Sequence, residues 1–252
     1  MSENDTASSF ISHLIELRDR LVRISVVVII VFLGLMPFAS HIFDLLAAPM
    51  MQALPAGAHM IATGVITPFL IPVKVTLVVA LLISLPWVLY QIWAFVAPGL
   101  YAHEKKLIAP LVIGSSALFL AGVAFCYFFV FRVVFAFVNQ FAPKSITVAP
   151  DIESYLDFVL TMFLAFGVTF EVPVIVVVLV RMGFVTVARL KEIRPYVIVG
   201  AFIIAAIVTP PDVTSQLLLA IPMCLLFEIG LLIAPWFKKA TAAPVDSAEN
   251  EH

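Results

Sequence analysis

Six long apolar runs, separated by short polar segments, restrict most strongly how this chain can fold. They cover residues 24–39, 75–96, 107–131, 158–180, 196–208 and 217–237. A helix of about 20 apolar residues crosses the roughly 30 Å hydrocarbon core of a bilayer. The runs are continuous, whereas the strands of a membrane barrel alternate apolar and polar residues over about ten positions. The sequence therefore predicts an all-α polytopic membrane protein with six transmembrane helices.

The composition excludes the other common classes of protein. Hydrophobic residues make up 63% of the 252 residues and charged residues only 12%, so a soluble globule could not cover its surface. The high apolar content argues against disorder, and two cysteines are too few for a disulfide scaffold. A net charge of -2 offers no basic surface for nucleic acid. We expect residues 1–237 to form a single integral membrane domain and residues 238–252 a flexible tail.

The placement of Lys and Arg predicts the orientation, because positively charged loops stay in the cytoplasm. With six spans, the amino terminus, the loops after the second and fourth spans and the carboxyl tail lie on one side. This side holds eleven of the 14 basic residues, whereas Lys74, Arg132 and Lys144 fall on or near the other side. Both termini are therefore predicted to be cytoplasmic. The amino terminus also lacks the short apolar region and cleavage site of a signal peptide, so the first span should be retained.

The fifth and sixth apolar runs are short for a simple crossing. Residues 196–208 make only about 20 Å of helix. Residues 217–227 supply only eleven apolar positions before Glu228 interrupts the run. We expect this hairpin to sit shallowly, to thin the bilayer or to be sheltered by other helices. The alternative, that flanking residues extend both helices to the interface, remains equally open.

The first outer loop, residues 41–71, is larger than a connector needs to be. Its residues Ile42, Phe43, Leu45 and Leu46 form an apolar stripe. This stripe predicts a short interfacial helix within an ordered cap on the outer side.

A helical stripe also precedes the first span. Phe10, Leu14, Leu17 and Leu21 recur at spacings of four, three and four, which places them on one face of a cytoplasmic amphipathic helix. A separate polar stripe on the same helix carries Glu16. The helix can serve as a topology anchor or as part of a binding site.

Glu16 has two interpretations. It can simply pair with Arg20, as Asp19 can pair with Arg23, at the i to i+4 spacing of a helix. Alternatively, it acts together with Glu104, which follows a helix-breaking segment on the same side of the membrane. Two exposed carboxylates can hold two guanidinium groups through bidentate, charge-assisted hydrogen bonds that lysine cannot reproduce.

Glu171 is the most anomalous residue of the apolar runs, because a carboxyl inside a span costs at least a few kcal/mol and usually faces a cavity or a partner. Gly167 and Pro173 flank it and leave room for a bend and for the close approach of another helix. A neutral carboxyl that is hydrogen-bonded inside the bundle is the simpler interpretation. The same interpretation applies to Glu228, which lies nearer a helix end.

Signatures of enzymes and of cofactor or metal sites are missing from the sequence. It contains no pair of histidines at metal-ligand spacing, no glycine-rich phosphate loop, and no nucleophile with a plausible base in the spans. The five histidines lie in loops or at helix ends, which argues against a haem held between spans. Two other classes remain: a secondary transporter with Glu171 as its proton-coupling site, and an intramembrane enzyme with a partner group opposite Glu171.

Four segments of the chain resemble the TatC family, the core receptor of the twin-arginine protein translocase. They are residues 13–18 (HLIELR), residues 95–101 (FVAPGLY) with Glu104, residues 166–173 (FGVTFEVP), and residues 194–196 (RPY) through 209–212 (TPPD). The resemblance extends from about residue 13 to residue 230, and the four motifs follow the family's order.

The resemblance implies a glove-shaped fold with a concave face and short fifth and sixth helices. It implies a receptor that binds twin-arginine signal peptides of folded proteins. With the single-span subunits TatA and TatB, such a receptor exports these proteins across the bacterial inner membrane by means of the proton-motive force. Self-association in a larger complex and contact with membrane lipid are also implied, and no cofactor is.

The resemblance also assigns roles to individual residues. The implied signal-peptide contacts are Glu16, Glu104, Phe95 and Arg18. Glu171 matches an intramembrane polar site in the concave face. Thr209 and Gln216 match positions where TatA and TatB dock, and Pro49, Pro210 and Asp212 match positions tied to structure or assembly.

Overall fold

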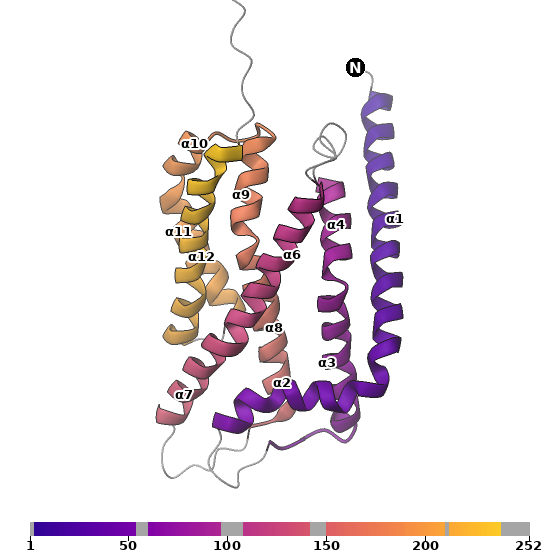
Figure 1. Cartoon of the computed structure of the whole chain (residues 1–252), viewed down its shortest axis with the longest axis vertical. Helices are drawn as coiled ribbons and strands as arrows, with labels where there is room; N and C mark the ends of the chain where they lie inside the picture. Colours follow the sequence, from indigo (N-terminus) through magenta and orange to yellow (C-terminus); the bar gives the residue numbers. More distant parts are fainter. Residues whose placement is uncertain (1–2, 54–59, 97–107, 142–149, 210–211, 238–252) are drawn as a thin grey trace, which may run out of the picture.

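The computed structural model describes residues 3–53, 60–96, 108–141, 150–209 and 212–237. Within these ranges the regular structure is helical, apart from one isolated bridge between Ile61 and Asp151. Figure 1 shows the helices running roughly along the long axis of the molecule, with α2 lying across one end.

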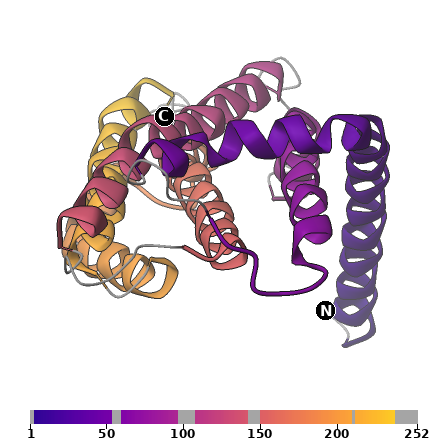
Figure 2. The same cartoon turned by 90° about the horizontal axis from the view of Figure 1, so that it is seen from below.

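Helix α1 (Glu3–Leu35) joins the predicted amphipathic segment and the first span in one continuous helix. Its 33 residues make a rod of about 50 Å. The helix ends where Pro37 lies in the short 3-10 turn η1 (Met36–Phe38), and the chain then enters α2 (Ala39–Ala53). Seen from below, α2 runs from the end of α1 toward the middle of the molecule (Figure 2). A helix in the first outer loop is therefore confirmed.

The second apolar run forms two helices, α3 (Thr67–Ile83) and α4 (Leu85–Val96), which meet at an angle of 61°. The bend lies at Ser84, two residues before Pro86, whose missing N–H removes one helical hydrogen bond. The helix begins eight residues earlier than the predicted start at residue 75. Lys74 does not delay the start, because it is paired with two carboxylates of a neighbouring helix.

The third and fourth runs are also longer than predicted. Helix α6 (Ile108–Phe125) continues through the π-helical turn η3 (Cys126–Val130) into α7 (Phe131–Phe141). Helix α8 (Ile152–Phe170) is followed at once by α9 (Val172–Arg181), with Glu171 between them. The side chain of Asp151 caps α8 by accepting the N–H of Ser154, so this helix starts before its apolar run does.

The last hairpin follows the short helix α10 (Val187–Glu192). Helix α11 (Arg194–Val208) has only 15 residues, or about 22 Å, which agrees with the predicted short fifth span. The prediction of a short sixth span is wrong. Helix α12 (Val213–Ile233) has 21 residues and continues into η4 (Ala234–Phe237). Glu228 does not end it, because an arginine of α11 pairs with this carboxylate.

Among the described residues, four helical stretches are long and apolar enough to cross a bilayer. The bent pair of α3 and α4 provides a fifth, and α11 is a shorter apolar helix. The start of α1 and the end of α12 lie at the same end of the molecule, opposite α2 (Figure 1). By length and composition, up to five of the described stretches could therefore cross a bilayer, and the remaining predicted crossing falls on the shorter helix α11.

The largest core cluster lies around η3, α7 and α8 and includes Phe131, Val159 and Phe166. Helices α6 and α8 approach closely because Gly122 and Gly167 face each other's helix. A Cβ on Gly122 would lie 2.5 Å from the Phe166 carbonyl oxygen, and a Cβ on Gly167 would overlap the Phe119 ring. The expected close approach of another helix at Gly167 is confirmed.

Candidate functional site

Glu16 lies on α1 and is bound by Arg20, one turn further along the same helix. Arg20 donates to Oε1 of Glu16 from Nε at 2.9 Å and from Nη2 at 2.6 Å. It also reaches α4, where Nη1 donates to Oε1 of Gln91 at 3.1 Å and Nη2 to the Ala94 carbonyl at 3.4 Å. The Arg20 side chain is 19% exposed, and that of Glu16 is 43% exposed. An internal guanidinium therefore holds this carboxylate at the surface.

Phe95 lies beside the same part of α1. Its ring stacks on that of His13, with centroids 4.3 Å apart and planes at 17°. Residues three apart in a helix share a face, so His13 and Glu16 are neighbours. The structure thus brings together two of the predicted signal-peptide residues, Glu16 and Phe95.

Arg18 is exposed and forms an ion pair of 2.8 Å with Asp19. The expected pairing of Asp19 with Arg23 is therefore wrong, whereas the expected pair of Glu16 with Arg20 is present.

The side chains of three further predicted residues lie outside the part of the chain that the structure describes. Glu104 and Pro210 lie outside the described residues. Pro49 lies within α2, and its side chain is outside the described part.

Glu171 is buried at the junction of α8 and α9, with 6% of its surface exposed. Its Oε2 accepts a hydrogen bond of 2.8 Å from the hydroxyl of Ser115, and that hydroxyl accepts one of 2.9 Å from Nε1 of Trp93. Its Oε1 has no partner within the described ranges. Three helices, α4, α6 and α8, thus meet at a polar chain inside an apolar interior.

A cavity of about 450 Å³ opens beside Glu171. Its walls come from the bent pair α3 and α4, from Phe119 of α6, and from α8 and α9, and almost all of its lining is apolar. Leu89, Trp93, Val168 and Phe184 are among the lining residues. The cavity has the size and chemistry for an apolar segment, and Glu171 is the ionisable group in its wall.

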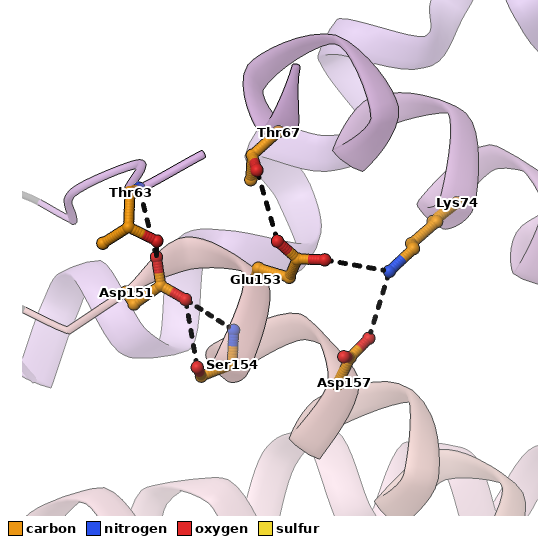
Figure 3. A network of polar contacts seen from close by, with 7 residues as sticks. All are labelled: Thr63, Thr67, Lys74, Asp151, Glu153, Ser154 and Asp157. Atoms are coloured by element: carbon orange, nitrogen blue, oxygen red, sulfur yellow. Dashed lines mark hydrogen bonds and ion pairs between the residues drawn. The ribbon is translucent and has the colours of Figure 1, made fainter. Parts of the chain in front are cut away.

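The end of the molecule that carries α2 is fastened by a polar network between α3 and α8 (Figure 3). Lys74 lies 3.5 Å from both Glu153 and Asp157. Thr67 donates to the second oxygen of Glu153 at 3.2 Å. One lysine thus joins the start of the second span to two carboxylates on the first turns of α8.

Asp151 closes the other half of this network (Figure 3). Its Oδ2 accepts the backbone N–H and the hydroxyl of Ser154, both at 3.0 Å, and its Oδ1 accepts the hydroxyl of Thr63 at 2.9 Å. The Ser154 N–H, followed by the Thr63 hydroxyl, lowers the pKa of Asp151 below its ordinary value. Backbone bonds of Ile61 with Pro150 and Ile152 run alongside.

The last hairpin contains the remaining predicted residues. Thr209 is buried, and its hydroxyl donates to the carbonyl of Ala205 in its own helix. Nε2 of Gln216 donates to the Phe202 carbonyl at 3.3 Å and ties α12 to α11. Asp212 caps α12 by accepting the Ser215 N–H at 2.7 Å. Of the two predicted docking residues, Gln216 is therefore the more accessible.

Comparison with known proteins decides the family. The family model of the Sec-independent protein translocase protein (TatC) matches residues 12–222. The chain is 54% identical over 238 residues to the Sec-independent protein translocase protein TatC of Haemophilus influenzae, with 94% of this chain and 93% of the relative covered. It is 51% identical over 237 residues to the TatC of Escherichia coli K12, with 94% and 92% covered.

The chain belongs to the TatC family.

A solved structure supports the same conclusion for the fold. The crystal structure of a twin-arginine translocase receptor, TatC, superposes with a TM-score of 0.78 at 37% identity and covers 89% of this chain and 99% of that one. The expected all-α polytopic membrane fold is therefore confirmed. As a TatC protein, the chain is a translocase subunit and not an enzyme. The interpretations as a small-solute transporter and as an intramembrane enzyme are set aside.

Sequence reasoning predicted the pair of Glu16 with Arg20 in this TatC protein but missed Gln91, which binds Arg20, and Ser115, which donates to Glu171. Gln91 and Ser115 are polar positions inside apolar runs, and that is the one signal that could have marked them. Nothing in the spacing indicated that Arg20 reaches α4 as well as Glu16. Among the described residues, no group of three His, Cys, Asp or Glu could hold a metal ion.

Proposed function

We propose that this chain is the signal-peptide receptor of the twin-arginine system in the bacterial inner membrane, with Glu16 and Glu104 binding the paired arginines. The observation that carries the proposal is that the end of α4, with Phe95, lies beside the part of α1 that carries Glu16. Carboxylates bind guanidinium groups through charge-assisted hydrogen bonds, and an aromatic ring beside them offers a stacking surface.

The orientation that we propose puts this site in the cytoplasm, together with both termini. The basic residues support it, because eleven of the 14 lie on this side of the predicted spans. On the opposite side, α2 and the network around Lys74 then form a cap toward the outside.

The apolar part of a signal peptide enters the cavity beside Glu171 in our proposal. Its volume of about 450 Å³ and its apolar walls support this role. The buried carboxyl of Glu171 supplies one hydrogen-bonding group in an otherwise apolar wall. In the same proposal, the proton-motive force supplies the energy for transport.

TatA and TatB dock on the hairpin of α11 and α12 in the same proposal. The outer face of α11 is apolar and open, with Tyr196 and Ile207 each 78% exposed. Gln216 offers a polar contact at this surface, which inside a bilayer adds to helix packing.

Site-specific photocrosslinking tests the receptor site. A photoreactive residue next to Glu16 should crosslink a signal peptide that carries Arg-Arg and should lose the crosslink when the pair is Lys-Lys. Glu16→Ala and Glu104→Ala should each weaken the crosslink. Glu192→Ala is the matched control, since Glu192 is an exposed carboxylate paired with Arg189 on the same side of the molecule. Equal crosslinking of both peptides in all variants would contradict the proposal.

A further inference from the structure

Arg20 is a guanidinium that already occupies the carboxylate at which, under the proposed function, a signal-peptide arginine binds. Its Nε and Nη2 both donate to Oε1 of Glu16, at 2.9 and 2.6 Å. A carboxylate oxygen accepts about two hydrogen bonds, so Oε1 is fully used. Oε2 accepts no hydrogen bond from the described residues. An arriving guanidinium can therefore engage both oxygens only after Arg20 has released Oε1.

We propose that Arg20 determines the specificity of the site, because recognition at Glu16 is an exchange of one guanidinium for another. This inference rests on the proposed function. An arginine of the signal peptide replaces the two bonds from Arg20 with two of its own. A lysine is a compact charge without the planar fork, so it cannot replace both bonds and loses the competition.

The surroundings of Arg20 suit such an exchange. After it leaves Glu16, Arg20 still has the Gln91 side chain and the Ala94 carbonyl on α4 as acceptors. Gln91 is itself 2% exposed and therefore fixed in place. Glu16 is 43% exposed, so a peptide reaches it from solution. The released guanidinium is not left unpaired, which keeps the cost of the exchange low.

The proposal predicts that weakening Arg20 makes the site less selective. In Arg20→Lys the side chain that binds Glu16 keeps its positive charge but loses the bidentate geometry. In Arg20→Gln it loses both the charge and the bidentate geometry. In each variant, Lys-Lys peptide should bind more tightly, while Arg-Arg peptide binds at least as tightly as before. We expect the Kd for the Lys-Lys peptide divided by the Kd for the Arg-Arg peptide to fall about threefold to tenfold.

The experiment measures Kd for both signal peptides with the full-length protein in nanodiscs. The matched control is Arg23→Lys, an exposed arginine on the same helix, which should leave the ratio unchanged. The reference for the site is Glu16→Gln, which should weaken both peptides. The thermal unfolding midpoint of every variant shows whether the fold is intact.

Two results would overturn the exchange. The first is that the ratio of the two Kd values stays unchanged in both Arg20 variants, while Glu16→Gln still weakens the binding of both peptides. The receptor site at Glu16 would then hold without the exchange. The other is an equal loss of affinity for both peptides in folded Arg20 variants, which would make Arg20 only a support for Glu16. If Glu16→Gln changes neither Kd, the receptor site at Glu16 fails, and the exchange fails with it.

Discussion

Ser115 is the only described side chain that donates to Glu171, and it does so in a buried site. Ser115→Ala removes this donor and leaves both oxygens of the carboxyl without a described protein partner, and it also removes the acceptor of the Trp93 N–H. A buried polar group without a partner costs about 1–3 kcal/mol. We expect the free energy of unfolding, measured by reversible unfolding in SDS, to fall by about this amount.

Ser116 provides the matched control. Its hydroxyl donates to the Val112 carbonyl within its own helix. That carbonyl keeps its helical partner when the hydroxyl is removed, so Ser116→Ala should change the free energy of unfolding by less than about 0.5 kcal/mol. Equal losses in the free energy of unfolding of the two variants would show that the buried bonds of Ser115 contribute no more to stability than the local bond of Ser116.

Asp151 should make the end of the molecule that carries α2 sensitive to acid. Its lowered pKa means that folding favours the ionised carboxylate. The stabilisation is thus fully present above the ordinary pKa of 3.8 and is lost as the pH falls through the lower value of the folded protein. Hydrogen exchange of the Ile61 and Ile152 amides, corrected for intrinsic rates, should speed up over this range.

Asp151→Asn is the control for this acid response. It removes the titrating group but keeps an acceptor for the Ser154 N–H. The exchange of the two amides should then no longer depend on pH in the acid range. If the exchange of these amides still speeds up fully at low pH in Asp151→Asn, a group other than Asp151 causes the acid response.

At the scale of residues, the sequence allowed the carboxylates to be found but not their partners. Glu16 and Glu171 stood out because charge is rare in this chain. The bonds of Arg20 to α4 and of Ser115 to Glu171 join positions 71 and 56 residues apart. Such contacts depend on how helices pack, and spacing along one helix carries no information about them.

The contact between α6 and α8 depends on two helical glycines. Gly122→Ala would place a Cβ 2.5 Å from a backbone oxygen of α8, which cannot move away as a flexible side chain can. We expect a loss of about 1–3 kcal/mol in the free energy of unfolding, because overpacking forces the backbones apart.

Gly114 is the matched control on the same helix. A Cβ at this position meets no atom within 4 Å. Gly114→Ala should be neutral or should stabilise by up to about 1 kcal/mol, because alanine favours a helix. A similar loss in both variants would contradict the role of close packing at Gly122.

At the scale of elements, apolar runs predicted the existence of helices better than their ends. Capping by Asp151 and Asp212 extends α8 and α12 beyond their apolar runs. Pairing of Lys74 and of Glu228 lets charged residues lie inside helices that were expected to start or stop there. The expected ends were wrong where a partner from another helix neutralised a charge.

The whole molecule has two ends that should be reachable from opposite sides of the membrane. Val65 is 99% exposed at the end that carries α2, and Lys191 is exposed in α10 at the other end. With Cys126 and Cys224 replaced, a Val65→Cys variant should react with an impermeant maleimide from the periplasm. A Lys191→Cys variant should react only in inverted vesicles, since the positive charges favour a cytoplasmic position. The reverse pattern would contradict the proposed orientation.

At this scale, the all-α polytopic membrane fold could be predicted from length and hydropathy, whereas the six crossings and the cytoplasmic side of both termini stay predictions. The 61° bend between α3 and α4 could not be predicted, because Pro86 alone predicts a break and not its angle. The cavity beside Glu171 could not be predicted either, because its lining comes from three separate segments of the chain, α3 with α4, α6, and α8 with α9.

Two kinds of interaction hold helix α1 in position, contacts with neighbouring helices and contacts with lipid. It packs on α3 and α4, yet only 6% of the most apolar 18-residue stretch in the α1 to α2 segment is buried inside the chain. Acyl chains therefore provide most of the hydrophobic stabilisation of α1, while contacts of His13 and Arg20 with α4 fix the segment between these two residues. The tilt of this helix should consequently follow bilayer thickness more closely than that of any helix in the core, so the lipid composition of a cell would tune the receptor's geometry.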